Sequence, residues 1–562
     1  MSLSSEQYAV AMADLRRGIG LGQLGPALQQ FLGRLEVGKA GIQQWIQSAE
    51  DLLRGNQAVP AGLLLEAGLN RWASSTTLRY LYGIALRLSG HVREAEQMFR
   101  EVIAAEPSHA DAPLALAFML REQGRLGAAA ETVLSLWRRH ARTRMGDART
   151  LRFLQECQRH AEAEEISQPV LDANPRDAEL LSMAGEISLT LGRFGSARRR
   201  LRLAVELDPQ QAAAWLRLAH THKFTRDDDP DLQLLAEAQQ RTDLQEPAAL
   251  CAAFGFGKAL DDLGDRPRAV QVLRKANAQS RRAFPWDQNG WQRFVEVQLR
   301  TRVPLPVDER TVPVFVVGLP RSGTTLVASQ LAKHPDVCNR SELNWIAALA
   351  AQLGPSPAAG ALSTAAHLYR NQLRQDDAAV RCYIDKNPLN FRHLGLIAAM
   401  YPNARIIHCR RDLRDTALSL WSQHFAHDDM NWAYDFADIG AYARGYHALM
   451  EHWRKVLPIR VLELDYESLV SNTSANLTRL YTFLGLQPPP ATPAAPAAAP
   501  PPATASADRK PRSADAPRDA IATASVWQAR QGVYASSVGR WKAYAPLLPE
   551  MDKLGVEIPR GA

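Results

Sequence analysis

A glycine-rich segment in the second half of the chain has the residue types of an anion-binding loop. The sequence VFVVGLPRSGTTLVASQ predicts a buried strand at Val314–Val317, a loop from Gly318 to Thr325, and a helix after it. The loop fits the frame G-x-x-x-x-G-K-[ST], except that Thr324 stands where the lysine is expected. Backbone N–H groups of such a loop bind anions, and Arg321 offers a planar fork for one phosphate or sulfate. The alternative is an ordinary strand–turn–helix joint.

A second segment, Arg405–Gln423, repeats this arrangement without glycines. Its sequence RIIHCRRDLRDTALSLWSQ predicts a short strand followed by a helix, with Arg411 at the strand end and Ser419 inside the helix. Because the carboxyl ends of parallel strands converge on one crevice, two such sites suggest a nucleotide that carries phosphate at two places. The alternative is a solvated cluster of charges at a helix start, formed by Arg410, Arg411, Arg414, Asp412 and Asp415.

The elements around these segments predict a parallel α/β sheet, because short β-branched runs alternate with helical segments after the Pro-rich junction TRVPLPVDERTVP. The predicted strands are Val314–Val317, Cys382–Ile384, Arg405–Cys409 and Arg460–Leu464. We assign this α/β domain to residues 311–562. A stretch of Pro, Ala, Ser, Thr and charged residues at 488–520 cannot bury a core, and we expect it to be a disordered insertion.

The first half of the chain repeats itself with a period of about 34 residues, which is the tetratricopeptide signature. Gln158 replaces the glycine in one unit, although Ala163 keeps the alanine that follows it by five residues. The positions in register are Gly90, Gly124 and Gly192 with Ala95, Ala129 and Ala197. Small residues let two antiparallel helices touch, and glycine suits the turn. We therefore predict a helical repeat solenoid over residues 73–305, preceded by a helical region at 1–72 with possible degenerate repeats.

Composition limits the classes of protein to which this chain can belong. The chain has 562 residues, of which 46% are hydrophobic and 22% are charged, and a formal charge of +7 without any long basic run. This excludes a fully disordered chain and argues against nucleic acid as the main partner. The five cysteines form no C-x-x-C pair, and neither a signal peptide nor an apolar run of ~20 residues is visible. We expect a cytoplasmic protein without a membrane span.

Together, the two anion segments resemble the 5′-phosphosulfate loop and the 3′-phosphate site of sulfotransferases, which use 3′-phosphoadenosine 5′-phosphosulfate. The repeats ahead of them are similar to those of the bacterial tetratricopeptide–sulfotransferase family. Within the superfamily, R-S-G-T-T-L followed by H-P and then a Glu resembles the tyrosylprotein sulfotransferases. The resemblance covers residues 75–562. It implies an all-α tetratricopeptide solenoid followed by an α/β P-loop-like sulfotransferase domain.

The resemblance also implies a set of donor-binding residues. The 5′-phosphosulfate would be held by Arg321, Ser322, Gly323, Thr324 and Thr325, and the 3′-phosphate by Arg411 and Ser419. Further contacts to the donor would come from Tyr466, Ser525 and Arg540, the last being a cation near the sulfate.

Three catalytic residues are implied as well. Glu342, 21 residues after Arg321, matches the family's base, and Lys386 matches the lysine that stabilises the sulfate being transferred. A hydroxyl acceptor must lose its proton as it attacks, and Lys386 and Arg321 can stabilise the charge on the departing bisphosphate. The alternatives are a helix-start glutamate for Glu342 and a surface-loop lysine for Lys386.

Other residues limit this assignment. His408, His424 and His427 lack a carboxylate–cysteine constellation, so we predict no metal. Asn344 occupies a position where the animal tyrosylprotein enzymes carry an arginine, which weakens the case for an acidic peptide as acceptor.

The function predicted from the sequence is therefore transfer of a sulfuryl group from 3′-phosphoadenosine 5′-phosphosulfate to a hydroxyl. A peptide tyrosine is named first as acceptor, with saccharide or small-molecule hydroxyls as alternatives. A tetratricopeptide scaffold with a degenerate nucleotide-binding domain is a rival, and the repeats would bind a peptide or protein partner. A kinase is disfavoured because Thr324 replaces the lysine that binds the β- and γ-phosphates. The oligomeric state is left open.

Overall fold

The chain divides into two compact units, residues 1–150 and 151–562. The computed structural model describes residues 4–37, 41–139, 143–301, 303–377, 379–425, 428–488 and 535–555. Except for Pro488, the predicted insertion at 488–520 lies outside the described residues, and so does Ser525. The domain boundaries predicted near residues 72 and 305 remain predictions.

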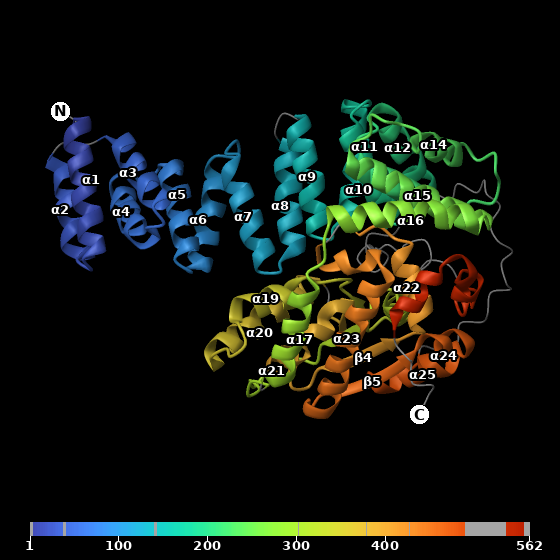
Figure 1. The fold of residues 1–562 in the computed structure, drawn as a ribbon. Helices are drawn as coiled ribbons and strands as arrows, with labels where there is room; N and C mark the ends of the chain where they lie inside the picture. The colour runs from blue at the N-terminus through green and yellow to red at the C-terminus, as the bar shows by residue number, and fades with distance from the viewer. Residues whose placement is uncertain are drawn as a thin grey trace. The chain divides into compact units, whose positions relative to one another are not determined.

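The first unit consists of helices that follow one another as antiparallel pairs (Figure 1). Its helices are α1 (Ser5–Gly20), α2 (Leu24–Val37), α3 (Ile42–Arg54), α4 (Ala58–Arg71), α5 (Thr76–Leu88), α6 (Val92–Ala105), α7 (Asp111–Glu122) and α8 (Leu126–Arg139), and α9 (Arg144–Glu156) continues into the second unit. Their apolar faces bury residues such as Trp45, Leu64 and Phe99. For the described part of residues 1–72, helices α1 to α4 agree with the predicted helical character.

The second unit begins with further helices of the same kind. These are α10 (His160–Ala173), α11 (Ala178–Thr190), α12 (Phe194–Leu207), α13 (Ala212–Ala219), α14 (Pro230–Ala238), α15 (Glu246–Leu263), α16 (Arg266–Ala283) and α17 (Gln288–Arg300). A side chain at Gly185 would place its Cβ 2.6 Å from Leu201 Cγ, so the small residue allows α11 and α12 to pack closely. The solenoid of helical repeats is therefore confirmed as a fold class.

The turns between paired helices require a left-handed backbone conformation. The turn glycines Gly90, Gly124, Gly192 and Gly264 have φ values between 76° and 84°. Glycine adopts this conformation without steric cost, whereas a residue with a Cβ is strained there. Gln158, at the turn between α9 and α10, nevertheless has a φ of 57°.

A five-stranded parallel sheet follows, in the order β2-β3-β1-β4-β5. The strands are β1 (Val314–Gly318), β2 (Val337–Asn339), β3 (Cys382–Asp385), β4 (Arg405–Arg410) and β5 (Arg460–Asp465). The four predicted strands are confirmed, and each extends one residue further at its carboxyl end. The three-residue strand β2 was not predicted.

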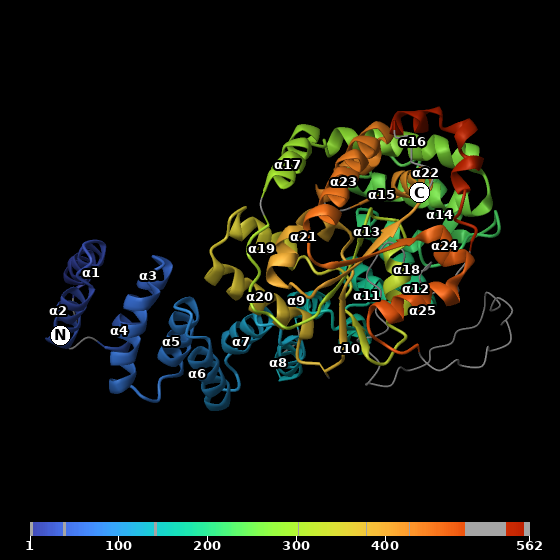
Figure 2. The same cartoon turned by 90° about the horizontal axis from the view of Figure 1, so that it is seen from below.

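Helices cover both faces of this sheet (Figure 2). They are α18 (Thr324–Leu331), α19 (Trp345–Leu353), α20 (Ala359–Arg374), α21 (Leu394–Met400), α22 (Leu413–Trp421), α23 (Phe436–Val456), α24 (Tyr466–Ser471) and α25 (Thr473–Phe483). Alternate residues of β1 face opposite layers, because side chains of a strand alternate. Val314 and Val316 pack with α18 and α25, whereas Phe315 and Val317 belong to a larger core on the other face.

That larger core also includes the last repeat helices, since Leu250 and Phe254 of α15 are part of it. The C-terminal segment 535–555 forms the short 3₁₀ helices η3 (Arg540–Ala543), η4 (Ala545–Leu547) and η5 (Pro549–Leu554), drawn in red beside α22 in Figure 1. Arg274 of α16 donates to Glu550 over 2.8 Å, so this segment contacts the repeat helices as well. Among the described residues, no helix combines the length and apolarity needed to cross a membrane.

Candidate active site

The glycine-rich loop lies between the end of β1 and the start of α18, as the sequence predicted. Gly318 and Gly323 have φ values of 153° and 100°. A Cβ at Gly318 would lie 2.4 Å from the carbonyl oxygen of Cys409, and one at Gly323 would lie 2.7 Å from Tyr466 Cδ2. The two glycines therefore allow the loop to approach β4 and the Tyr466 ring closely. Gly323 also precedes the first turn of α18 without a side-chain cap, which leaves N–H groups for an anion.

Two arginines connect this loop to the second predicted anion site. Arg321 Nε donates to Ser419 Oγ over 3.0 Å, and Arg411 Nη1 donates to the carbonyl oxygen of Arg321 over 3.0 Å. The Arg411 guanidinium also lies 4.6 Å from the centre of the Tyr466 ring, and its Nη2 donates to the carbonyl oxygen of Ser537 over 2.7 Å. The structure thus brings Arg321, Arg411, Ser419 and Tyr466 together at the carboxyl ends of β1, β4 and β5.

Two buried polar atoms of this group have no hydrogen-bond partner within the described ranges, namely Ser322 Oγ and Arg411 Nε. Ser322 is 2% exposed. A buried polar group without a partner is costly, so a bound anion would satisfy both atoms. The residues present therefore fit a donor with two separate phosphate groups.

The remaining arginines near β4 have other partners. Arg414 pairs with Asp412 over 2.8 Å, as the charge-cluster alternative predicted for that pair. Arg410 pairs with Glu463 and Asp465 of β5. The cluster of charges at this helix start is therefore divided, and only Arg411 reaches the loop.

Glu342 and Lys386 meet at the other end of the sheet edge. Glu342 follows β2 and Lys386 follows β3, and Lys386 Nζ donates to Glu342 Oε1. Lys386 is 1% exposed in its side chain, whereas Glu342 is 42% exposed. The carboxylate of Glu342 thus reaches solvent while the ammonium group of Lys386 is buried against it.

Backbone contacts fix this pair. Lys386 N donates to the carbonyl oxygen of Ser341 over 2.8 Å, and Leu343 N donates to Asp385 Oδ1 over 3.3 Å. Ser341 has a φ of 57°, which is uncommon for a residue with a side chain. The loop after β2 is therefore bound to the end of β3 on both sides of Glu342.

Asp385 is a buried carboxyl group that sequence reasoning missed as a site residue. It accepts hydrogen bonds from Tyr369 Oη over 2.7 Å and from Asn390 Nδ2 over 2.9 Å, in addition to Leu343 N. Burial raises the pKa of Asp385 to about 7, although these hydrogen bonds act in the opposite direction. The only sequence signal was its place at a predicted strand end, directly before Lys386.

The C-terminal segment is held by Asp415, a second acidic residue that was missed. Asp415 is 2% exposed and accepts hydrogen bonds from Gly539 N over 2.6 Å and from Trp541 N over 2.8 Å. Between them, Arg540 binds Asp261 of α15 and lies 3.4 Å from Tyr544 Oη. These two contacts of Arg540 involve none of the other predicted site residues, and its role near the sulfate remains a prediction.

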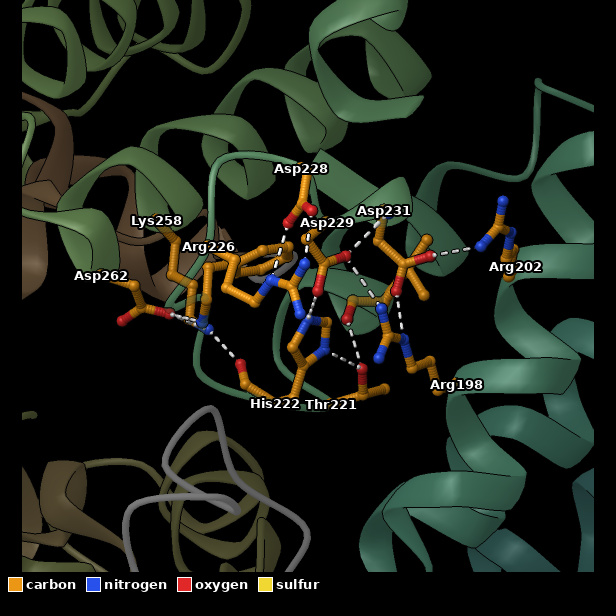
Figure 3. A network of polar contacts seen from close by, with 12 residues as sticks. Arg198, Arg202, Thr221, His222, Arg226, Asp228, Asp229, Asp231, Lys258 and Asp262 are labelled. Carbon is orange, nitrogen blue, oxygen red and sulfur yellow. Dashed lines mark hydrogen bonds and ion pairs between the residues drawn. The ribbon is translucent and has the colours of Figure 1, made fainter. Parts of the chain in front are cut away.

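A separate polar cluster lies in the repeat helices (Figure 3). Ligand atoms of His222, Asp229 and Asp231 lie within 4.8 Å of one another, a spacing that could suit a metal ion. However, Arg198 donates to both carboxylates, over 2.8 Å to Asp229 and 2.5 Å to Asp231. Arg202 also pairs with Asp231 over 3.4 Å, so two guanidinium groups balance the two carboxylates. We interpret the cluster as an ion-pair network that joins α12 to α14.

Comparison with known proteins identifies the two kinds of domain. Residues 313–490 match the model of a sulfotransferase family, and residues 86–151 match a tetratricopeptide repeat model. Residues 313–490 are a sulfotransferase-family domain. This sulfotransferase-family segment contains the glycine-rich loop, Glu342, Lys386, Arg411, Ser419 and Tyr466, whereas Ser525 and Arg540 lie beyond it.

One relative is similar to this chain over most of the chain's length. An uncharacterized protein of Aquifex aeolicus (strain VF5) is 26% identical over 423 residues, which are 71% of this chain and 53% of that protein. The chain thus spans about half the length of this curated relative.

Two solved structures are also similar in part. The sulfotransferase domain of the Synechococcus PCC 7002 olefin synthase is 17% identical and has a TM-score of 0.30. The match covers 46% of this chain and 100% of that domain. YrrB, described as a tetratricopeptide protein with an unusual peptide-binding site, is 15% identical and has a TM-score of 0.24. The match covers 37% of this chain and 96% of the YrrB chain.

Proposed function

We propose that this protein transfers a sulfuryl group from 3′-phosphoadenosine 5′-phosphosulfate to a hydroxyl group. The observation that carries the proposal is the direct connection between two anion sites, through Arg321 to Ser419 and through Arg411 to the Arg321 carbonyl oxygen. A donor with phosphate groups at its 5′ and 3′ positions would contact both sites at once. Thr324 in place of the Walker lysine argues against a triphosphate.

In the proposed reaction the acceptor oxygen attacks the sulfur of the donor, and the bond from sulfur to the 5′-phosphate oxygen breaks. The acceptor proton passes to Glu342, and adenosine 3′,5′-bisphosphate leaves with an additional negative charge. Lys386 and Arg321 stabilise that charge, as positioned cations do in loose phosphoryl-type transition states. The contact between Lys386 and Glu342 supports this division of roles, since it holds the proposed base next to a proposed stabilising cation.

The proposal also extends to the acceptor, to the partner of the repeat helices and to the compartment. The sequence resemblance implies a peptide tyrosine as acceptor, with saccharide or small-molecule hydroxyls as the alternatives. The cavity described in the next subsection favours a saccharide. Tetratricopeptide repeats commonly bind peptides, so we propose a peptide or protein partner for the repeat helices. The predicted cytoplasmic location remains a prediction.

Calorimetry on the purified full chain tests the proposed donor. Adenosine 3′,5′-bisphosphate should bind far more tightly than Mg-ATP, and EDTA should not change its affinity. Mass spectrometry should then detect the mass gain of one sulfuryl group on an acceptor supplied with the donor. Tight binding of Mg-ATP together with no binding of the bisphosphate would contradict the proposal. Binding without transfer to any acceptor would favour the rival scaffold function.

A further inference from the structure

A cavity of about 230 Å³ opens beside Glu342. Its walls come from three segments: residues 155–160 at the turn between α9 and α10, residues 339–342 after β2, and residues 375–377 after α20. The first segment belongs to the repeat helices and the other two to the sulfotransferase-family domain. The cavity is smaller than the ~300–1,000 Å³ usual for a whole small-molecule ligand, so it suits one unit of a larger acceptor.

Backbone strain is concentrated at this cavity. Within the described part of the chain, five residues other than glycine have a positive φ, and Gln158, Ser341 and Gln375 of this set line the cavity. Strained residues of this kind are typical of functional sites, where the surrounding structure holds them in place. Gln158 stands at a turn position that is glycine in other repeats, at Gly90, Gly124, Gly192 and Gly264, although Asn56 between α3 and α4 also carries a side chain there, with a φ of 56°. Of these two side chains, that of Gln158 belongs to a residue lining the cavity beside the proposed base.

Several lining side chains keep hydrogen-bonding capacity. Buried nitrogen atoms of Arg159 (Nε), His160 (Nδ1) and Gln375 (Nε2) have no partner in the ranges that the structure describes. Arg159 and His160 are 9% and 8% exposed. Burial lowers the pKa of His160 to about 4, so its imidazole is neutral at neutral pH. These atoms favour a ligand that offers polar groups on several sides.

The walls are fixed to each other by Asp377. One of its oxygens accepts from Arg159 Nη2 over 2.9 Å, and the other accepts from Arg340 Nη1 over 2.5 Å. Arg340 is 3% exposed and also donates to the carbonyl oxygens of Leu373 and Arg374. The repeat turn and the loop before Glu342 are therefore held in one frame, which preorganises the cavity for binding.

The chemistry of the lining distinguishes between acceptor classes. Every lining residue is polar or charged by type, His160 supplies the only ring among them, and the apolar part of the wall comes from the carbon atoms of these residues. A tyrosyl side chain needs apolar surface for its ring, because its burial is driven mainly by the apolar part. Amides, carboxylates and guanidinium groups side by side instead match the alternating donors and acceptors of a polyhydroxylated molecule.

We propose that the repeat turn Gln158–Arg159–His160 and the loops around Glu342 form the acceptor subsite, and that this subsite takes a neutral saccharide. The inference rests on the proposed function, because it uses Glu342 as the base toward which the acceptor hydroxyl points. It assigns the repeat helices a direct part in substrate recognition, in addition to any partner that they bind elsewhere.

The test compares acceptors and one pair of variants on the full chain. Neutral saccharides of two to six units and tyrosine-containing peptides are supplied with the donor, and transfer is followed by mass gain. Gln158→Gly should raise KM for the saccharide about 3- to 10-fold, the effect of one lost hydrogen bond, with kcat and bisphosphate affinity unchanged. The matched control is Gly90→Gln, at the equivalent turn between α5 and α6, where an added Cβ meets open space. It should leave KM unchanged.

The outcomes separate the inference from the proposed function. Transfer to saccharides with a raised KM in Gln158→Gly alone supports the inference. A higher kcat/KM for the tyrosine peptides than for every saccharide would overturn it, and so would an unchanged KM in Gln158→Gly. Failure to bind the bisphosphate, with no transfer to any acceptor, would instead contradict the proposed function itself.

Discussion

The two halves of the sheet edge are built in different ways. The donor half, which is the glycine-rich loop with Arg411, Ser419 and Tyr466, stands on the adjacent strands β1, β4 and β5. The acceptor half, which is Glu342 and Lys386 with the cavity beside them, stands on β2 and β3 and on a turn of the repeat helices. In the donor half, side chains contact backbone atoms of neighbouring loops, as Arg411 does with the Arg321 carbonyl oxygen.

This difference separates the donor half, whose geometry must stay constant, from the acceptor half, whose lining can vary. The geometry of the donor half follows from strand order and from glycines that the loop requires. The acceptor half depends on contacts between parts of the chain that are far apart in sequence, such as Arg159 with Asp377. A change in the repeat turn can therefore alter acceptor choice without moving the donor site.

The largest expected effect is on turnover, and it tests the acceptor half. Glu342→Gln keeps the size of the side chain but removes the proton acceptor, so turnover should fall by roughly 10²–10⁴. Bisphosphate affinity should change by no more than a few-fold, since the donor half is untouched. The control is Glu463→Gln, a carboxylate of β5 that pairs with Arg410. Near-normal turnover in Glu342→Gln would remove this residue from the mechanism.

The next largest expected effect is on the free energy of unfolding. It arises from Asp385, the buried residue directly before Lys386. Its folded pKa of about 7 lies above the unfolded value of about 3.9, so the folded state binds more protons between these values. Stability should therefore fall as pH rises from 4 to 7, by on the order of 4 kcal/mol, and then level off. Denaturant unfolding at several pH values measures this slope. The slope should be reduced in Asp385→Asn, and an equal slope in both proteins would contradict the assignment.

A third effect tests the donor half alone. Arg411→Ala should weaken bisphosphate binding by about 2–4 kcal/mol, because a phosphate would lose its charged partner. The loss should nearly vanish for a nucleotide without the 3′-phosphate, which calorimetry can measure. Arg414→Ala serves as the control, since Arg414 pairs with Asp412 and lies 3.8 Å from the Trp541 ring centre. Equal losses for both nucleotides would mean that Arg411 only supports the fold.

The smallest effect concerns the strained turn. Gln158→Gly should raise the free energy of unfolding by about 1 kcal/mol, because glycine adopts a positive φ without steric cost. Gly90→Gln should lower it by a similar amount. Both changes can be measured by denaturant titration of the full chain. A loss of stability in Gln158→Gly would show that this side chain supports the fold rather than the cavity.

Much of the donor half could be predicted because its signals are local. A strand, a glycine-rich loop and a helix adjoin one another in sequence, and hydrophobic runs predicted four of the strands. Each prediction ended one residue early, since the backbone ladder continues through polar or small residues such as Gly318 and Asp385. Strand β2 was missed because Val337–Asn339 is too short to give a pattern.

The acceptor half could not be predicted in the same way. The replacement of glycine by Gln158 was visible in the sequence, but nothing there indicated that this turn adjoins Glu342. Outside the acceptor half, no pattern in the sequence connected the C-terminal segment with Asp261 or with Asp415 either. Such contacts join residues more than a hundred positions apart, and they depend on how whole elements pack rather than on local propensity.

The attachment of segment 535–555 has a consequence for protein engineering. This segment binds α15 through Asp261, α16 through Arg274, and α22 through Asp415. A chimera joined at the Pro-rich junction near residue 305 would discard α15 and α16 and leave the end of the chain without these partners. A chimera joined before α9, which begins at Arg144, would keep them, so the exchangeable cassette is the set of helices α1 to α8.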